Sequence, residues 1–144
     1  MAPKVQPSVI PPSYTQNTPP SSFAEPDHGT LTWHTIFSSP QTPTDSLCCG
    51  VAFCRPGDGI LHHHRHTQAE IYHITEGKGV VYIEGKEYDV EAGSSVFIPG
   101  DAEHGIRAVA EEGVRWFYVF PGGAFGDVHY RFTHEEKQGE AAKA

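Results

Sequence analysis

Four potential metal ligands in two widely separated stretches constrain how this chain can fold. His64, His66 and Glu70 form a His-x-His-x-x-x-Glu pattern, and His104 follows much later. Side chains alternate between the two faces of a strand, so His64 and His66 point the same way in an extended chain. Glu70 can join them if a bend at residues 67–68 keeps this phase. His104 has to arrive from a second strand, so the fold must bring two distant strands together.

Three imidazoles and one carboxylate form a ligand set that suits a divalent transition metal. We expect one such ion per chain, bound by His64, His66, Glu70 and His104. Mixed nitrogen and oxygen ligation is accepted by iron, nickel, manganese and zinc. Iron is the favoured ion, and the other three are possible.

These residues resemble the two sequence motifs of the cupin family. The first motif combines a His-x-His pair and a glutamate with a glycine, which here is Gly77. The second contains a glycine and ends in a proline followed five residues later by histidine, here Gly93, Pro99 and His104. Ala108 stands where many members have asparagine, a departure that changes no ligand. The resemblance implies a single-domain antiparallel jelly-roll β-barrel.

A second histidine pair competes with the first. His62 and His64 have the same spacing as His64 and His66, and they would also share a face of a regular strand. Only His64 and His66 place the glutamate at the spacing of the first cupin motif, so we predict that His62 is not a ligand. We interpret five other histidines as surface or hydrogen-bonded residues: His28, His34, His73, His129 and His134.

Short β-branched and aromatic runs predict an all-β protein. The 144 residues suffice for one domain, and the 15 glycines and 12 prolines favour many turns. We expect hairpin turns at residues 76–79 and 84–86. We expect strands near residues 31–36, 47–53, 60–66, 70–75, 80–83, 88–90, 95–99, 105–109, 114–120 and 126–132. This number and spacing of strands fit a sandwich or a jelly-roll barrel.

The two ends of the chain differ in composition from the middle. Residues 1–22 contain half of all the prolines, and such a segment cannot pair inside a sheet. We expect an extended or disordered arm there, within which the apolar side chains of residues 9–14 could pack on a partner subunit. We assign residues 23–134 to the cupin barrel and residues 135–144 to a charged flexible tail.

Composition excludes several classes of partner. A net charge of −8 argues against binding nucleic acid or an acidic membrane. No stretch has the length of a transmembrane helix, and the N-terminus lacks the order of a secretory signal, so we expect a cytoplasmic protein with a small-molecule substrate. Cys48, Cys49 and Cys54 have no CxxC spacing, and we interpret them as small buried residues. The cupin resemblance implies a homodimer.

Tyr72 is a candidate general base. It follows Glu70 by two positions and shares its strand face, so its hydroxyl can reach the metal cavity. A nearby divalent cation stabilises phenolate and lowers the pKa of a tyrosine from its free value of about 10. Tyr72 could then accept a proton near neutral pH.

A closer resemblance is to the cupin-type dimethylsulfoniopropionate lyases. It is carried by residues 69–72, 75–79, 96–98, 102–104, 117–121 and Tyr130. In those enzymes the metal holds the substrate carboxylate, a tyrosine matching Tyr72 takes the α-proton, and one matching Tyr130 lines the pocket. The resemblance implies a carbon–sulfur lyase, or more broadly a lyase or isomerase of small carboxylates, with Tyr72 and Tyr130 as catalytic residues.

An aromatic wall would suit the sulfonium cation of this substrate. Candidates are Trp33, Tyr82, Phe97, Trp116, Tyr118 and Tyr130. Two other functions remain open. An open three-histidine site can present iron to oxygen, as in a non-haem iron dioxygenase, and a metal can also stabilise a binding cupin that has no turnover.

Overall fold

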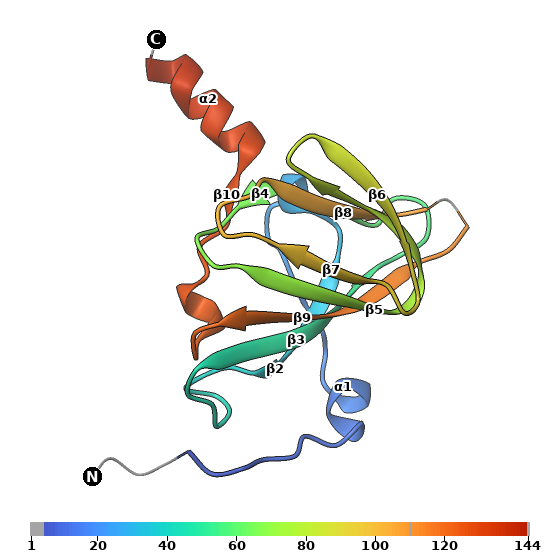
Figure 1. Ribbon diagram of the computed structural model, residues 1–144, viewed down its shortest axis with the longest axis vertical. Coiled ribbons are helices and arrows are strands. Elements are labelled where there is room, and N and C mark those ends of the chain that lie inside the picture. The colour runs from blue at the N-terminus through green and yellow to red at the C-terminus, as the bar shows by residue number, and fades with distance from the viewer. Residues whose placement is uncertain (1–4, 110, 144) are drawn as a thin grey trace.

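The structure is a computed structural model that describes residues 5–109 and 111–143. It is mostly β, with two short α-helices, α1 (Ser13–Asn17) and α2 (Thr133–Lys143), and two 3₁₀ turns, η1 (Pro26–His28) and η2 (Phe125–Asp127) (Figure 1). The strands are β1 (Ser21–Ser22), β2 (Thr32–Phe37), β3 (Leu47–Cys54), β4 (Ile60–Arg65), β5 (Glu70–Ile83), β6 (Lys86–Glu91), β7 (Ser95–Ile98), β8 (His104–Ala108), β9 (Val114–Pro121) and β10 (Arg131–Phe132).

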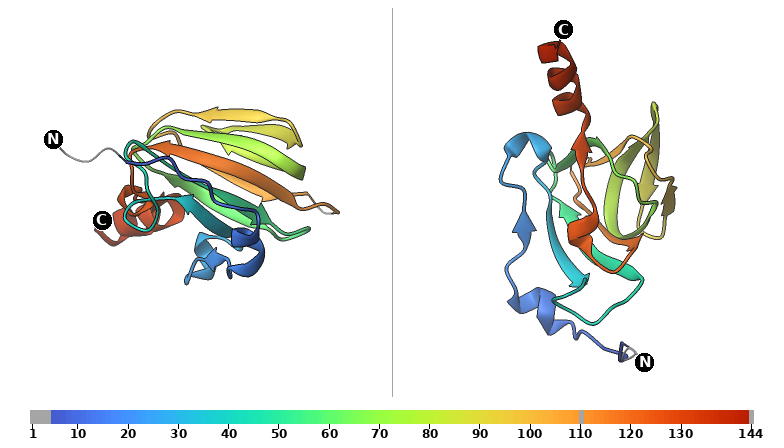
Figure 2. Two further views of the ribbon diagram at one scale, coloured as in Figure 1. Left: turned by 90° about the horizontal axis from the view of Figure 1, so that it is seen from below. Right: turned by 90° about the vertical axis from the view of Figure 1, so that its left-hand side faces the viewer.

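The strands form one curled antiparallel sheet. Its order is β1-β2-β3-β9-β5-β8-β4-β10, and β6 and β7 also pair with β5. Figure 2 shows the sheet folded over its own inner face, with α2 projecting from the barrel. The predicted antiparallel barrel in a single domain is confirmed.

Strand β5 forms the corner of this barrel. Its first part, up to Gly77, pairs with β7 and β9, and its second part, from Lys78, pairs with β6 and β8. The hairpin turn expected at residues 76–79 is therefore wrong, because the strand bends there and continues. Gly77 makes the bend possible with a φ of +78°, which few side chains tolerate.

The inner face of the sheet forms the core, because the inward side chains alternate with outward ones along each strand. On β5 and β9, Tyr72, Ile74, Trp116 and Phe120 are buried, with Phe132 of β10 beside them. The cysteines belong to the same alternation on β3. Two are buried, one is half-buried, and all three thiols are free, namely those of Cys48, Cys54 and Cys49.

Both ends of the chain contain helices. Within the proline-rich arm, the Tyr14 hydroxyl of α1 donates a 3.0 Å hydrogen bond to the carbonyl oxygen of Thr35. Where a flexible tail is expected from residue 135, α2 carries two glutamates in its first turn and Lys143 in its last, which complements the helix dipole. Among the described residues, no helix combines the length and apolar character needed to cross a membrane.

The segment before α2 differs from the strand expected over residues 126–132. It holds the turn η2 and then only the two-residue strand β10, which pairs with β4. The pairing sets Phe132 opposite His64. This short strand fixes the position of the preceding residue, Tyr130, beside the histidines.

Because of the bend in β5, we expect substitution by alanine to destabilise the protein unequally at two glycines. A Cβ at Gly77 would overlap the carbonyl oxygen of Gly113, whereas at Gly85, with a φ of +85°, nothing lies within 4 Å. Gly77→Ala should lower the free energy of unfolding by about 3 kcal/mol or more, the sum of backbone and overpacking costs. Gly85→Ala should cost only the backbone part, about 1–2 kcal/mol. Denaturant unfolding of both variants measures this, and equal losses would contradict crowding at the bend.

Candidate metal centre

Three buried imidazoles meet inside the barrel. Candidate ligand atoms of His64, His66 and His104 all lie within 4.8 Å of one another, and each side chain is almost completely buried. His64 of β4 and His104 of β8 are direct cross-strand partners. His66 follows the end of β4, and Glu70 begins β5. Strand pairing thus brings the two stretches of the sequence together.

A bulge in β4 separates His62 from this cluster. The register between β4 and β8 shifts between Leu61 and His64, and both of these residues are buried. Regular alternation would place His62 and His64 on one face, but the extra residue changes the phase. His62 is only half-buried and lies near His134, with ring centroids 6.4 Å apart. His62 therefore lies outside the group of three buried histidines.

Each imidazole is oriented by a backbone carbonyl. The Nδ1 atoms of His64, His66 and His104 lie 2.8, 2.9 and 2.8 Å from the carbonyl oxygens of His62, Gln68 and Ala102. A carbonyl oxygen can only accept, so Nδ1 carries the hydrogen in each ring. In the neutral imidazole the Nε2 atom then keeps its lone pair. This is the arrangement that orients histidine ligands of metals.

Two of the three Nε2 atoms lack the hydrogen-bond partners that buried polar atoms need. Those of His64 and His66 are buried without a hydrogen bond. Glu70 Oε1 lies 3.3 Å from Nε2 of both His66 and His104, but the contact with His66 lacks hydrogen-bond alignment. A carboxylate facing imidazole lone pairs is repulsive unless a cation lies between them. The donor set therefore fits a divalent transition metal ion.

Burial shifts the pKa values around the centre. Burial first, and then the neighbouring His104, hold the pKa of His64 well below its usual 6.5, which favours the neutral form that binds metal. Burial first, and then the Glu70 charge, raise the pKa of Tyr72 and of Tyr130 well above the usual 10. Without a cation, both tyrosines therefore stay protonated at neutral pH.

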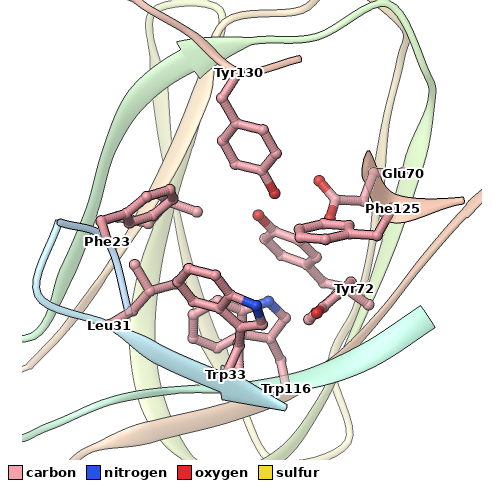
Figure 3. A pocket seen from close by; sticks show the side chains of 11 residues that line it. Phe23, Leu31, Trp33, Glu70, Tyr72, Trp116, Phe125 and Tyr130 are labelled. Carbon is pink, nitrogen blue, oxygen red and sulfur yellow. The ribbon is translucent and has the colours of Figure 1, made fainter. Parts of the chain in front are cut away.

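A small cavity adjoins the centre (Figure 3). Its volume is about 20 Å³, which is room for about one water molecule. The hydroxyl groups of Tyr72 and Tyr130 point toward each other beside the Glu70 carboxylate. The Tyr130 ring also stacks on His64, with a centroid distance of 4.5 Å and an interplanar angle of 6°. The two tyrosines thus border both the cavity and the imidazoles.

Four of the predicted aromatic residues line this cavity, namely Trp33, Trp116, Tyr118 and Tyr130. Tyr82 does not, because it stacks on His63 and donates a 2.8 Å hydrogen bond to Glu103. Phe97 points outward and is 64% exposed. The prediction that Tyr82 and Phe97 belong to the wall is therefore wrong.

The cavity is also lined by residues that were not predicted from the sequence. Phe23, Leu31 and Phe125 line it from the segment after the arm and from η2. Four aromatic residues of the wall also border an outer depression of about 360 Å³, namely Phe23, Trp33, Phe125 and Tyr130. These rings separate the inner cavity from the surface.

A second group of potential ligands lies on the surface. Asp27, His134 and Glu135 approach one another, and His134 Nε2 lies 3.2 Å from Asp27 Oδ2. His28 contacts Glu135 in the same group. These contacts join η1 to α2, and each of the two histidines already has a carboxylate partner. They account for the positions of these residues without a metal.

Known proteins resemble this chain in sequence and in fold. A family model of the cupin domain matches residues 52–120. Dimethylsulfoniopropionate lyase DddW of Ruegeria pomeroyi is 38% identical over 118 residues, covering 82% of this chain and 76% of that protein.

Two solved structures have a similar fold. The polyketide cyclase RemF of Streptomyces resistomycificus has a TM-score of 0.71 at 18% identity, covering 87% of this chain and 86% of that one. The DMSP lyase DddQ of Ruegeria pomeroyi has a TM-score of 0.61 at 22% identity, covering 75% of this chain and 53% of that one. At these identities the likeness concerns the fold alone. With its antiparallel barrel, its buried histidines and its similarity to DddW, the chain belongs to the cupin family.

Proposed function

We propose that this protein is a metal-dependent lyase that cleaves dimethylsulfoniopropionate to acrylate and dimethyl sulfide. One observation carries the proposal: a carboxylate and two tyrosine hydroxyls border an aromatic cavity directly beside three buried, oriented imidazoles. The 38% identity to a protein named dimethylsulfoniopropionate lyase supports this substrate.

The metal would be held by His64, His66, His104 and Glu70, whose inward nitrogen and oxygen atoms fit it. Iron is our favoured ion, and nickel, manganese or zinc would accept the same ligands. When bound, a divalent cation supplies Lewis-acid charge that stabilises a substrate carboxylate and a neighbouring phenolate. This charge has to offset the burial that raises the pKa of Tyr72.

Tyr72 would act as the general base. Its phenolate takes a proton from the carbon next to the substrate carboxylate. The electron pair left on this carbon forms the carbon–carbon double bond, and the carbon–sulfur bond breaks with its pair on sulfur. Dimethyl sulfide leaves as a neutral molecule, so this step needs no proton donor.

The aromatic wall would bind the sulfonium group. Trp33, Trp116 and Tyr130 offer ring faces to a cation, and Tyr130 adds a hydroxyl beside Glu70. The cavity has room for about one water molecule, so substrate entry requires the rings at its outer wall to move. Phe23, Phe125 and Tyr130 are the aromatic wall residues that lie outside the named strands.

The ligand assignment predicts which histidine variants lose metal. Elemental analysis of purified protein should find stoichiometric transition metal in the wild type, and little in His66→Ala and His104→Ala. His62→Ala, in the bulged stretch of β4, should keep most of it. Unchanged metal content in His104→Ala, or a reversed order of His62→Ala and His66→Ala, would overturn the assignment.

The proposed reaction predicts that products form without consumption of oxygen. Metal-loaded protein mixed with dimethylsulfoniopropionate should release dimethyl sulfide and acrylate in equal amounts, in air and under nitrogen alike. Gas chromatography and an oxygen electrode measure both. Stoichiometric oxygen uptake would instead indicate a dioxygenase. Bound metal without turnover of any small carboxylate would indicate a binding protein.

The role of Tyr72 predicts a specific loss of rate. Tyr72→Phe keeps the ring, so fold and metal content should persist while turnover falls by about 10²-fold or more, the usual contribution of a positioned base. Tyr82→Phe is the matched control, because its hydroxyl bonds to Glu103 outside the cavity. Activity of the wild type should rise with pH as the phenol ionises, and this rise should vanish in Tyr72→Phe. A near wild-type rate in Tyr72→Phe would refute the role.

A further inference from the structure

The helix α2 is attached to the barrel without burying a side chain. It projects from the barrel (Figure 1), and none of residues 133–143 is buried. An isolated helix of this length is only marginally stable in water, so its contacts with the rest of the protein matter. These are polar and come from its first turn, to Asp27, His28, Glu103 and Arg131.

Two of these contacts reach one segment of the cavity wall. His134 Nε2 donates a 3.2 Å hydrogen bond to Asp27 Oδ2, and Glu135 Oε1 accepts one from His28 Nε2. Asp27 and His28 belong to residues 23–28, which we call the strap. Phe23, at the start of the strap, lines both the inner cavity and the outer depression. The helix α2 therefore holds the segment that supplies this ring.

The strap is fixed at its two ends. Before it, β1 pairs with β2, and after it Gly29 bridges to Leu61. Among the described residues, the polar and ring contacts that tie the strap to the rest of the protein are those of Phe23, Asp27 and His28. A segment held in this way opens more readily than a strand inside a sheet.

His28 connects α2 to the aromatic wall. Its ring stacks on Phe132, with a centroid distance of 3.9 Å and an interplanar angle of 6°. Phe23 lies perpendicular to both rings, with centroids 5.5 Å from His28 and 5.7 Å from Phe132. On its other side Phe23 lies 6.1 Å from Tyr130 at the cavity (Figure 3). The contact with Glu135 thus holds a group of rings that ends at the cavity.

The opposite part of the wall is fastened more firmly. The backbone N–H of Phe125 in η2 donates a 2.8 Å hydrogen bond to Oγ of Ser38, which is buried. Leaving a buried hydroxyl without its partner is costly. The contacts between the strap and α2 are partly exposed, and ion pairs of this kind are weak. The strap is therefore the side of the wall that opens.

We propose that α2 is a latch on the entrance to the inner cavity. Its contacts with Asp27 and His28 hold the strap closed, and their release lets Phe23 move away, so that a small molecule can pass from the outer depression into the cavity. Each contact changes the ratio of open to closed protein by up to about fivefold, which suits a wall that opens and closes repeatedly. This inference concerns access to the cavity and does not rest on the proposed reaction.

Quenching of tryptophan fluorescence by acrylamide tests the latch on the full-length chain. The chain has two tryptophans, and Trp116 lines the cavity and is only 1% exposed. In a Trp33→Phe background, Trp116 alone reports entry of this neutral quencher. His134→Asp sets a second carboxylate against Asp27 and should raise the quenching constant about two- to fivefold. An aspartate in the first turn favours a helix, so circular dichroism should show that α2 persists.

Three further variants separate the latch from a general loss of structure. Asp27→His combined with His134→Asp restores the contact in reverse and should return the quenching constant to that of the background protein. Glu135→Gln weakens the contact with His28 and should raise the constant in the same direction as His134→Asp. The matched control is Glu136→Gln, in the same turn of α2, because this carboxylate lies 4.0 Å from Arg131 and does not contact the strap. It should leave the constant unchanged.

Three results would overturn the latch. These are unchanged quenching in both His134→Asp and Glu135→Gln, an equal rise in Glu136→Gln, and a reversed pair that quenches as readily as His134→Asp alone. If His134→Asp does not fold, Glu135→Gln and its control decide. Absence of turnover with every substrate would count against the proposed reaction and would leave these outcomes unaffected.

Discussion

The candidate site depends on how three imidazole rings are held. Backbone carbonyls accept the Nδ1 hydrogens of His64, His66 and His104, so the three Nε2 lone pairs face the barrel interior and the Glu70 carboxylate. Buried lone pairs without donors are costly, and a cation is the one partner that satisfies all of them together. The pairing of β4 with β8 and the position at which β5 begins bring these side chains together.

The same burial that orients the ligands sets the chemistry of the cavity. Tyr72 and Tyr130 are enclosed by aromatic rings and face Glu70, and both influences raise their pKa values. A bound divalent cation acts in the opposite direction. The base proposed for the reaction is therefore available only when the site is loaded, which couples proton abstraction to the presence of metal.

Much of the fold follows from local patterns in the sequence. Alternation of apolar residues indicated most strands, and the spacing of His64, His66 and His104 indicated the cluster, because strand periodicity fixes which side chains share a face. The bulge that excludes His62 and the bend at Gly77 were not predictable in this way, since each depends on contacts with another strand. Phe23 was missed for a similar reason: its place in the wall is set by long-range packing.

X-ray absorption spectroscopy of the metal that co-purifies with the protein tests the central claim most directly. The account predicts imidazole nitrogen together with carboxylate oxygen at about 2.0–2.2 Å from the metal. Sulfur at about 2.3 Å, as a cysteine thiolate would give, or a shell of water oxygens without imidazole scattering would contradict it.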